Sequence, residues 1–186
     1  MEELGMKDAL ESDHIDEIVK EIKQRETEGY AYEDADASFE LMVHRRLTGK
    51  PLFFEVPSYR VLGERRFNGK GERVNMSEAT TKITVDGEMI MTVAEGNGPV
   101  DALDKALRKA LVPKFKQLEH MRLTDYKVRI LASSDATEAV TRVMIESRDD
   151  KGNVWNTIGV SPNVIDASFM ALNDSITYCL LRGKKK

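Results

Sequence analysis

The sequence predicts an α+β fold in which one βββα unit occurs twice, with internal pseudo-two-fold symmetry, after a short helical segment. Residues 77–85 align without a gap with residues 137–145, and residues 87–107 align in the same way with residues 152–172. Nine of these aligned pairs are identical, whereas unrelated segments of this length share roughly two. Each copy also shows the hydrophobic periodicity of three strands followed by a helix. Because a half-apolar sheet needs a cover, two such units are expected to close over one core.

The helical segment is expected to form a linker subdomain over residues 1–50. Apolar residues at helical spacing predict a first helix that begins near Ser12, and Gly29 is expected to end it in the left-handed conformation. A second helix is predicted from about Asp34 to Leu47, before the break at Gly49-Lys50-Pro51. Two short helices bury little surface alone, so this segment must pack on another part of the protein.

The remaining residues, 51–186, are expected to form the main domain, with one βββα unit over residues 51–122 and the other over residues 123–186. The predicted strands of the first unit lie near residues 53–67, 79–85 and 88–94, and its helix begins near Pro99. The predicted strands of the second unit lie near residues 125–132, 139–147 and 154–160, and its helix carries an apolar stripe from Ile165 to Leu180.

The composition indicates a globular protein and excludes several classes of function. Hydrophobic residues make up 41% of the chain and charged residues 32%, which favours a folded body over a disordered one. The formal net charge of −4 argues against a general nucleic-acid binder, and no stretch approaches the ~20 apolar residues of a membrane span. Cys179 is the only cysteine, which excludes an internal disulfide and a thiolate zinc site and fits the cytoplasm.

The sequence shows no arrangement of catalytic residues. His14, His44 and His120 are scattered without metal-ligand spacing. There is no phosphate-binding glycine loop and no nucleophile that a base could activate. We therefore expect no catalytic residue, no metal site and no cofactor in this chain.

Two predicted strand-to-helix junctions place an aspartate at the same position. Gly98 and Asn163 fit the helix cap, and Asp101 and Asp166 each follow three residues later. An aspartate there stabilises the helix by a few tenths to ~1 kcal/mol through the helix dipole. Free backbone N–H groups at a helix start also bind carboxylates, and the aspartate could then bind the ammonium group of the same molecule. The two roles are compatible, and a free amino acid needs both kinds of partner.

A cluster of basic residues supports a second hypothesis. With the helix before it, the first unit reads αβββα, the element order of a double-stranded-RNA-binding domain. The second copy lacks lysines on the equivalent helix face, so we favour a solvated helix surface. A third hypothesis is a duplicated domain that only joins subunits. The basic residues are Lys105, Arg108, Lys109, Lys114, Lys116 and Arg122.

Several segments match a known family in the order in which that family has them. Residues 96–107 (GNGPVDALDKAL) and residues 157–168 (TIGVSPNVIDAS) carry the match in the two units, and residues 28–41 carry it in the helical segment. These segments resemble the regulatory domain of the 2-isopropylmalate and citramalate synthases and the linker before it, with the citramalate-type branch favoured. The resemblance extends from about residue 13 to residue 182.

The resemblance implies a regulatory function. Family members condense acetyl-CoA with a 2-oxo acid on a TIM barrel that uses a divalent metal and lies N-terminal to this region. Their regulatory domain dimerises and binds the branched-chain product that inhibits the enzyme. For this chain the resemblance implies a homodimer that binds isoleucine, with leucine next, and acts on the catalytic barrel of a parent acyltransferase. The hinge is expected near Gly29 or Gly49.

The resemblance also implies an effector site. It carries over to Val100 and Asp101 at the first helix start, to Leu123, Tyr126 and Ile130 in the strand that follows, to Val140 in the next strand, and to Pro162 and Val164 at the second helix start. The aliphatic residues could surround a four-carbon side chain, whose burial contributes ~0.8 kcal/mol per CH₂. A tyrosine adds apolar area with a polar tip. For the aliphatic strand residues, ordinary core packing is an equally good interpretation.

Overall fold

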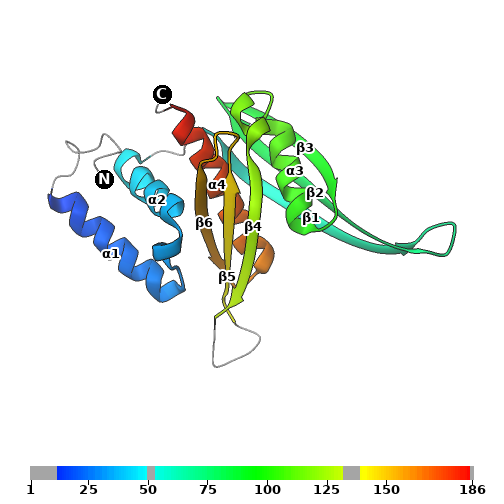
Figure 1. Cartoon of the computed structure of the whole chain (residues 1–186), viewed down its shortest axis with the longest axis horizontal. Coiled ribbons are helices and arrows are strands. Elements are labelled where there is room, and N and C mark those ends of the chain that lie inside the picture. The colour runs from blue at the N-terminus through cyan, green and yellow to red at the C-terminus, as the bar shows by residue number, and fades with distance from the viewer. Residues whose placement is uncertain (1–11, 50–52, 132–138, 185–186) are drawn as a thin grey trace.

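The computed structural model describes residues 12–49, 53–131 and 139–184 and has the predicted α+β architecture (Figure 1). The lead-in consists of α1 (Ser12–Glu28), the short 3₁₀ helix η3 (Tyr32–Asp34) and α2 (Asp36–Thr48). The first unit contains β1 (Glu55–Phe67), β2 (Arg73–Val85), β3 (Glu88–Gly96) and α3 (Pro99–Leu111), followed by the 3₁₀ helix η4 (Lys116–His120). The second unit contains β4 (Arg122–Ile130), β5 (Thr141–Arg148), β6 (Val154–Ser161) and α4 (Val164–Lys184). The duplicated βββα order is therefore confirmed. Residue 132, which ends one predicted strand, and Lys50 and Pro51 of the predicted break lie outside the described residues.

Each unit forms its own three-stranded antiparallel sheet, in the order β1-β2-β3 and β4-β5-β6. The hairpin between β2 and β3 turns at Asp86 and Gly87, whose φ angles are 51° and 80°. Two successive positive φ angles are typical of the tight turn that the Asp-Gly pair predicts. Gly152, with a φ angle of 82°, lies in the corresponding β5–β6 hairpin.

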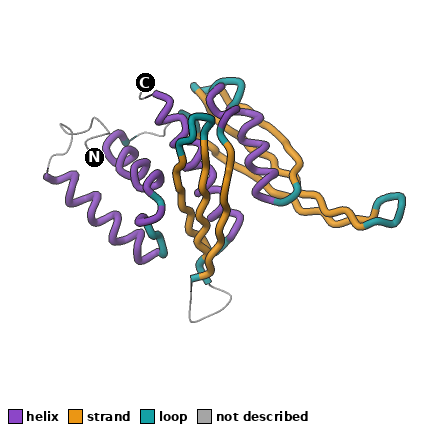
Figure 2. Tube along the Cα trace, in the orientation of Figure 1, coloured by secondary structure: helices purple, strands orange, loops and turns teal. Residues whose placement is uncertain are grey.

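The hairpin of β1 and β2 is longer than the sequence predicts. β2 begins at Arg73 rather than near Ala79, and backbone pairing continues out to Phe67 and Arg73. Figure 2 shows the two strands extending beyond the rest of the sheet as a ribbon. The residues of β1 from Gly63 onward are exposed. Because this part buries no apolar face, the alternation on which strand prediction depends is weak there.

One buried hydrogen bond recurs at the centre of both units. The Thr92 hydroxyl donates to the Ala106 carbonyl at 2.7 Å, and the Thr157 hydroxyl donates to the Ala171 carbonyl at 2.8 Å. Both bonds link the third strand of a unit to its helix, and both residue pairs are identical in the sequence alignment. The two helices and both sheets contribute to one hydrophobic core. The repeated threonine bond therefore sets each helix at the same position on its sheet.

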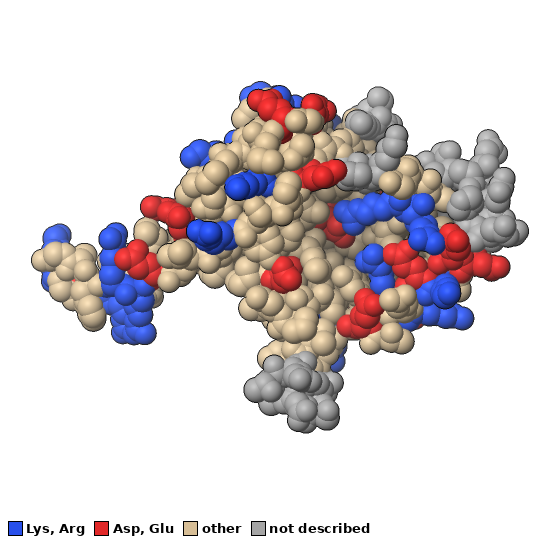
Figure 3. All heavy atoms as spheres, turned by 180° about the vertical axis from the view of Figure 1, so that it is seen from behind, with Lys and Arg blue, Asp and Glu red and all other residues tan. Residues whose placement is uncertain are grey.

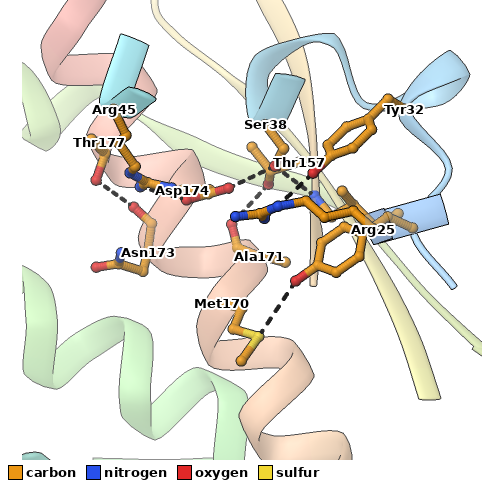
Figure 4. Close-up of polar contacts among 12 residues, drawn as sticks. Arg25, Tyr32, Ser38, Arg45, Thr157, Met170, Ala171, Asn173, Asp174 and Thr177 are labelled. Carbon is orange, nitrogen blue, oxygen red and sulfur yellow. Dashed lines mark hydrogen bonds and ion pairs between the residues drawn. The ribbon is translucent and has the colours of Figure 1, made fainter. Parts of the chain in front are cut away.

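The lead-in is attached to the second unit by a buried polar contact (Figure 4). The Ser38 side chain in α2 is 3% exposed, and its hydroxyl donates to Asp174 of α4 at 2.8 Å. The same oxygen accepts the Ile158 N–H of the edge strand β6 at 3.0 Å. Arg45 of α2 donates to the other Asp174 oxygen at 2.7 Å. Ala35 and the side chains of Tyr30 and Tyr32 pack on the outer face of the second sheet, which is the face away from α4. The predicted need of the lead-in for a packing surface is thus met within this chain.

Replacing Gly159 with alanine is expected to destabilise the fold by about 3 kcal/mol, because overpacking a core typically costs ~1–3 kcal/mol. A Cβ atom at Gly159 would lie 2.0 Å from the Ala167 carbonyl oxygen, which belongs to the backbone of α4. Denaturant unfolding of Gly159→Ala measures the loss. Gly63→Ala is the matched control, since a Cβ atom at Gly63 meets nothing within 4 Å. Equal unfolding midpoints for the two variants would contradict this packing.

Replacing Ser38 with alanine is expected to cost about 1–3 kcal/mol of unfolding free energy, because a buried N–H group and a buried carboxylate oxygen each lose a partner. Thr48→Ala at the end of α2 is the control, since the Thr48 hydroxyl is exposed and, among the described residues, donates to the His44 carbonyl. Thermal unfolding of both variants checks the prediction. It fails if Ser38→Ala loses no more stability than Thr48→Ala.

Candidate functional site

β4 carries an exposed row of apolar side chains on the inner face of the second sheet, which is the face that α4 packs against. Tyr126, Val128 and Ile130 are 40%, 46% and 70% exposed. They pair with Ile145, Val143 and Thr141, which are buried and face α4. β4 is an edge strand, and α4 covers β5 and β6 but leaves this row open. A contiguous apolar surface of this kind is typical of a site where another molecule binds.

The start of α4 lies against this row. The Tyr126 hydroxyl is 2.7 Å from the Ser168 hydroxyl, which donates to the Val164 carbonyl at 2.6 Å. Val164 is 40% exposed, and Pro162, two residues before it, is also exposed. Four of the residues that the sequence singles out, counting Ile130, therefore lie on one side of the second unit.

The two helix starts of the repeat differ in their caps. At α4, Asn163 caps the helix as predicted, and its side-chain oxygen accepts the Ile165 N–H at 2.8 Å. At α3, Gly98 is the predicted cap residue, and Pro99 opens the helix. Glycine has no side chain with which to cap, so the first N–H groups of α3 have no side-chain partner among the described residues. Of the two helix starts, α3 offers the freer backbone donors for an anion.

Asp101 lies beside these donors. Its carboxylate accepts the Asn97 N–H and the Lys105 ammonium, both at 2.8 Å. The hydrogen bond from Lys105 lowers the pKa of the Asp101 carboxyl, and the Asn97 N–H lowers it further. The capping role predicted for Asp101 is therefore present. Its side chain is 40% exposed, so a ligand can still reach the ionised carboxylate.

In the other half of the repeat, the equivalent tyrosine and aspartate bond to each other. Tyr59 takes the place of Tyr126 in the repeat, since it pairs with the β2 residue opposite Thr92, as Tyr126 pairs with the β5 residue opposite Thr157. Its hydroxyl donates to Asp166, the counterpart of Asp101. The Tyr59 ring also stacks on Phe169 with centroids 4.3 Å apart. Burial, followed by the bond to Asp166, raises the pKa of Tyr59. One tyrosine–aspartate pair thus links the two units internally, whereas Tyr126 and Asp101 bond to other groups and remain partly exposed.

The predicted effector residues do not all lie around one point of a single chain. Leu123 and Ile130 are seven residues apart on β4, or about 23 Å, and Leu123 packs against the core. Val140 lies on the opposite face of the second sheet, in a cluster with Val160 and Ile158. One small ligand cannot contact all of these residues in one copy. Sequence reasoning also missed Val128 and Ser168, although the alternation of Tyr126, Val128 and Ile130 indicates Val128.

A hollow of about 460 Å³ lies between the lead-in and α4. Three of its charged side chains are paired: Arg45 bonds Asp174, and Arg25 bonds Glu21 and the Tyr32 hydroxyl. Burial is the main cause that raises the pKa of Tyr32 to about 12. We interpret this hollow as part of the joint between lead-in and second unit.

Four of the six residues in the basic cluster are paired with acidic neighbours, whereas Lys109 donates to the Val93 carbonyl at 3.2 Å. Lys105 bonds Asp101, Arg108 bonds Asp104 at 2.8 Å, and Lys114 bonds Glu88 at 3.0 Å. The face of the molecule in Figure 3 likewise intersperses basic and acidic side chains over the body. This arrangement favours the solvated helix surface over the RNA-binding hypothesis.

The described residues contain no group of three or more His, Cys, Asp or Glu side chains that could hold a metal ion. Among the helices described, none is long and apolar enough to cross a membrane.

Comparisons with known proteins agree with this architecture. The family model of the LeuA allosteric (dimerisation) domain matches residues 33–180. The (R)-citramalate synthase of Streptomyces coelicolor is 46% identical over 182 residues, which cover 97% of this chain and 33% of that protein. The enzyme of the same name from Geobacter sulfurreducens is 46% identical over 175 residues, covering 91% of this chain and 32% of the relative. The 2-isopropylmalate synthase of Aquifex aeolicus is 29% identical over 183 residues, covering 98% and 31%.

The chain thus spans about a third of the length of the curated relatives that it matches. The family match includes α2, both βββα units and most of α4. On this evidence, the chain belongs to the family of LeuA allosteric (dimerisation) domains, which occur in citramalate and 2-isopropylmalate synthases.

Proposed function

We propose that this chain is the feedback-regulatory part of a citramalate-type synthase, in which it dimerises and binds isoleucine, with leucine as the weaker effector. The higher identity to (R)-citramalate synthases than to the 2-isopropylmalate synthase supports that branch. The other two-thirds of the relatives' length leaves room for a catalytic barrel. In the proposed parent acyltransferase, that barrel would bind acetyl-CoA and the divalent metal.

The exposed apolar row on β4 carries the proposal. Tyr126, Val128 and Ile130 form an uncovered surface on a domain whose family dimerises. A second copy that covers this row would exclude water from the space between it and the start of α4. The side chain of a bound isoleucine would add its own apolar area there, at ~0.8 kcal/mol per buried CH₂.

The charged ends of the effector need donors and an acceptor. The uncapped N–H groups at Val100 and Asp101 suit the carboxylate, and the Asp101 carboxylate suits the ammonium group. Pro162 and Val164 would border the side chain at the start of α4. Because Leu123 and Ile130 lie too far apart for one ligand, we propose that the site is completed by residues of the second copy. Val140, on the outer face of the sheet, would then influence the site without contacting the effector.

Asp101→Asn is expected to weaken isoleucine binding at least tenfold, because a charge-assisted hydrogen bond contributes about 1.5–3 kcal/mol. Calorimetric titration with isoleucine and leucine measures the affinity. Asp86→Asn is the control, since it makes the same change at an exposed turn, at the end of β3 opposite the start of α3. If Asp101 is only a helix cap, Asp101→Asn lowers the melting temperature but binds isoleucine as tightly as Asp86→Asn.

Val128→Glu is expected to shift the protein from dimer to monomer, because it places a charge within the apolar row. Light scattering with and without isoleucine measures the mass. Val154→Glu is the control, since Val154 is equally exposed, at 46%, but lies outside the row on β6. A dimer that persists in Val128→Glu would contradict the assignment of this row to the interface. A dimer that forms normally but binds no branched-chain amino acid would indicate a purely structural dimerisation domain.

A further inference from the structure

Gly29 directly follows α1 and packs closely against side chains on the outer face of the second sheet. Its φ angle is 109°, a conformation that side-chain-bearing residues rarely adopt. A Cβ atom there would lie 2.4 Å from the Leu131 Cδ1 atom, 3.4 Å from Val160 and 3.8 Å from Val140. The expected hinge at Gly29 is therefore a tightly packed contact. The other expected hinge, Gly49, has nothing within 4 Å of such an atom.

A polar contact holds the same glycine in place. The Arg142 Nε–H group donates to the Gly29 carbonyl at 2.5 Å, across 113 positions of the chain. Arg142 is the second residue of β5, and Arg129 on β4 is its cross-strand partner. The end of α1 is thus joined to the second sheet by one hydrogen bond, at a position where three aliphatic side chains leave no room for a Cβ atom. We call Leu131, Val140, Arg142 and Val160 the glycine seat.

The glycine seat lies directly behind the apolar row. Ile130 and Leu131 are neighbours in an extended segment, so their side chains point to opposite faces of the sheet. Ile130 faces the proposed effector side and is 70% exposed, whereas Leu131 contacts the Gly29 position. The Leu131 N–H donates to the Val140 carbonyl at 2.8 Å, which extends the β4–β5 pairing into the seat. A ligand that orders Ile130 must therefore also order Leu131.

α1 depends on this seat for its direction. α1 is also attached to α2, through the buried Ile18 and the ion pair of Glu17 with Arg46 at 2.8 Å, and to Tyr32, through the Arg25 guanidinium at 3.4 Å. α2 is fixed independently by Ser38 and Arg45. When Gly29 leaves its seat, the end of α1 loses the hydrogen bond from Arg142 of β5, while Ser38 and Arg45 keep α2 docked.

We propose that the glycine seat couples effector binding to the position of α1, so that isoleucine favours the seated state of Gly29. This inference rests on the proposed effector site and names its route of regulation. Coupling between two sites is reciprocal. If isoleucine binds the seated state more tightly, a variant with a smaller seated population binds isoleucine more weakly, in proportion to the population lost.

Arg142→Met tests the coupling, because it keeps the aliphatic stem of Arg142 and removes the donor to Gly29. In the unmodified chain, isoleucine is expected to slow hydrogen exchange of the α1 amides several-fold. In Arg142→Met without ligand, these amides should exchange faster, and isoleucine affinity should fall about three- to tenfold by calorimetry. Arg129→Met is the matched control, since it removes one charge from the same cross-strand pair and leaves the seat intact. Arg142→Leu, which likewise has no side-chain donor, serves if Arg142→Met does not fold.

The outcomes separate this inference from the proposed function. Isoleucine binding that leaves α1 exchange unchanged overturns the coupling and preserves the effector site. Equal isoleucine affinities for Arg142→Met and Arg129→Met do the same. Failure of the unmodified chain to bind isoleucine or leucine overturns the effector site and, with it, the coupling. In that case, faster α1 exchange in ligand-free Arg142→Met than in Arg129→Met would show the seat to be purely structural.

Discussion

The fold depends on the fact that neither βββα unit can bury enough apolar surface alone. A three-stranded sheet with one helix has a single thin core, and here α3, α4 and both sheets share one cluster. The buried threonine-to-helix bonds, Thr92 to Ala106 and Thr157 to Ala171, set both helices in the same way. The close approach of Gly159 to the Ala167 carbonyl brings α4 still nearer to its sheet. With both helices set in this way, the two halves can close on each other.

The proposed function depends on departures from the internal symmetry. Tyr59 and Asp166 form a closed link between the units, whereas Tyr126 and Asp101 remain partly exposed. Asn163 caps one helix start, and Gly98 leaves the other uncapped. A perfectly symmetric duplication would be a scaffold with two equivalent ends. The open half has the donors, the carboxylate and the apolar surface that a free amino acid requires.

The lead-in is part of the same body as the units. The Ser38 hydroxyl accepts a hydrogen bond from an outward-facing N–H group of the edge strand β6. The Asp174 side chain, which is 14% exposed, forms an ion pair with Arg45. Gly29 contacts the sheet behind the apolar row. A segment that would otherwise be a passive linker is therefore in contact with the strand that carries Ile130, which gives the proposed effector a short physical route to whatever precedes α1.

The sequence by itself determined the duplicated architecture, the tight hairpin at Asp86-Gly87 and the helix starts at Gly98 and Asn163. These features follow from local rules: the repeat, the alternation of apolar residues, and the few residue types that tolerate a positive φ angle or cap a helix. It did not determine the length of the β1–β2 hairpin, because residues that bury nothing leave no periodic signal.

Only the tertiary structure decided which of the singled-out residues share a surface. It placed Tyr126, Ile130 and Val164 together, Leu123 in the core and Val140 on the opposite face. In the sequence, a valine of the core cannot be distinguished from a valine of a binding site. The difference lies in what covers the side chain, and that is set by contacts between residues more than a hundred positions apart, such as Gly29 with Arg142.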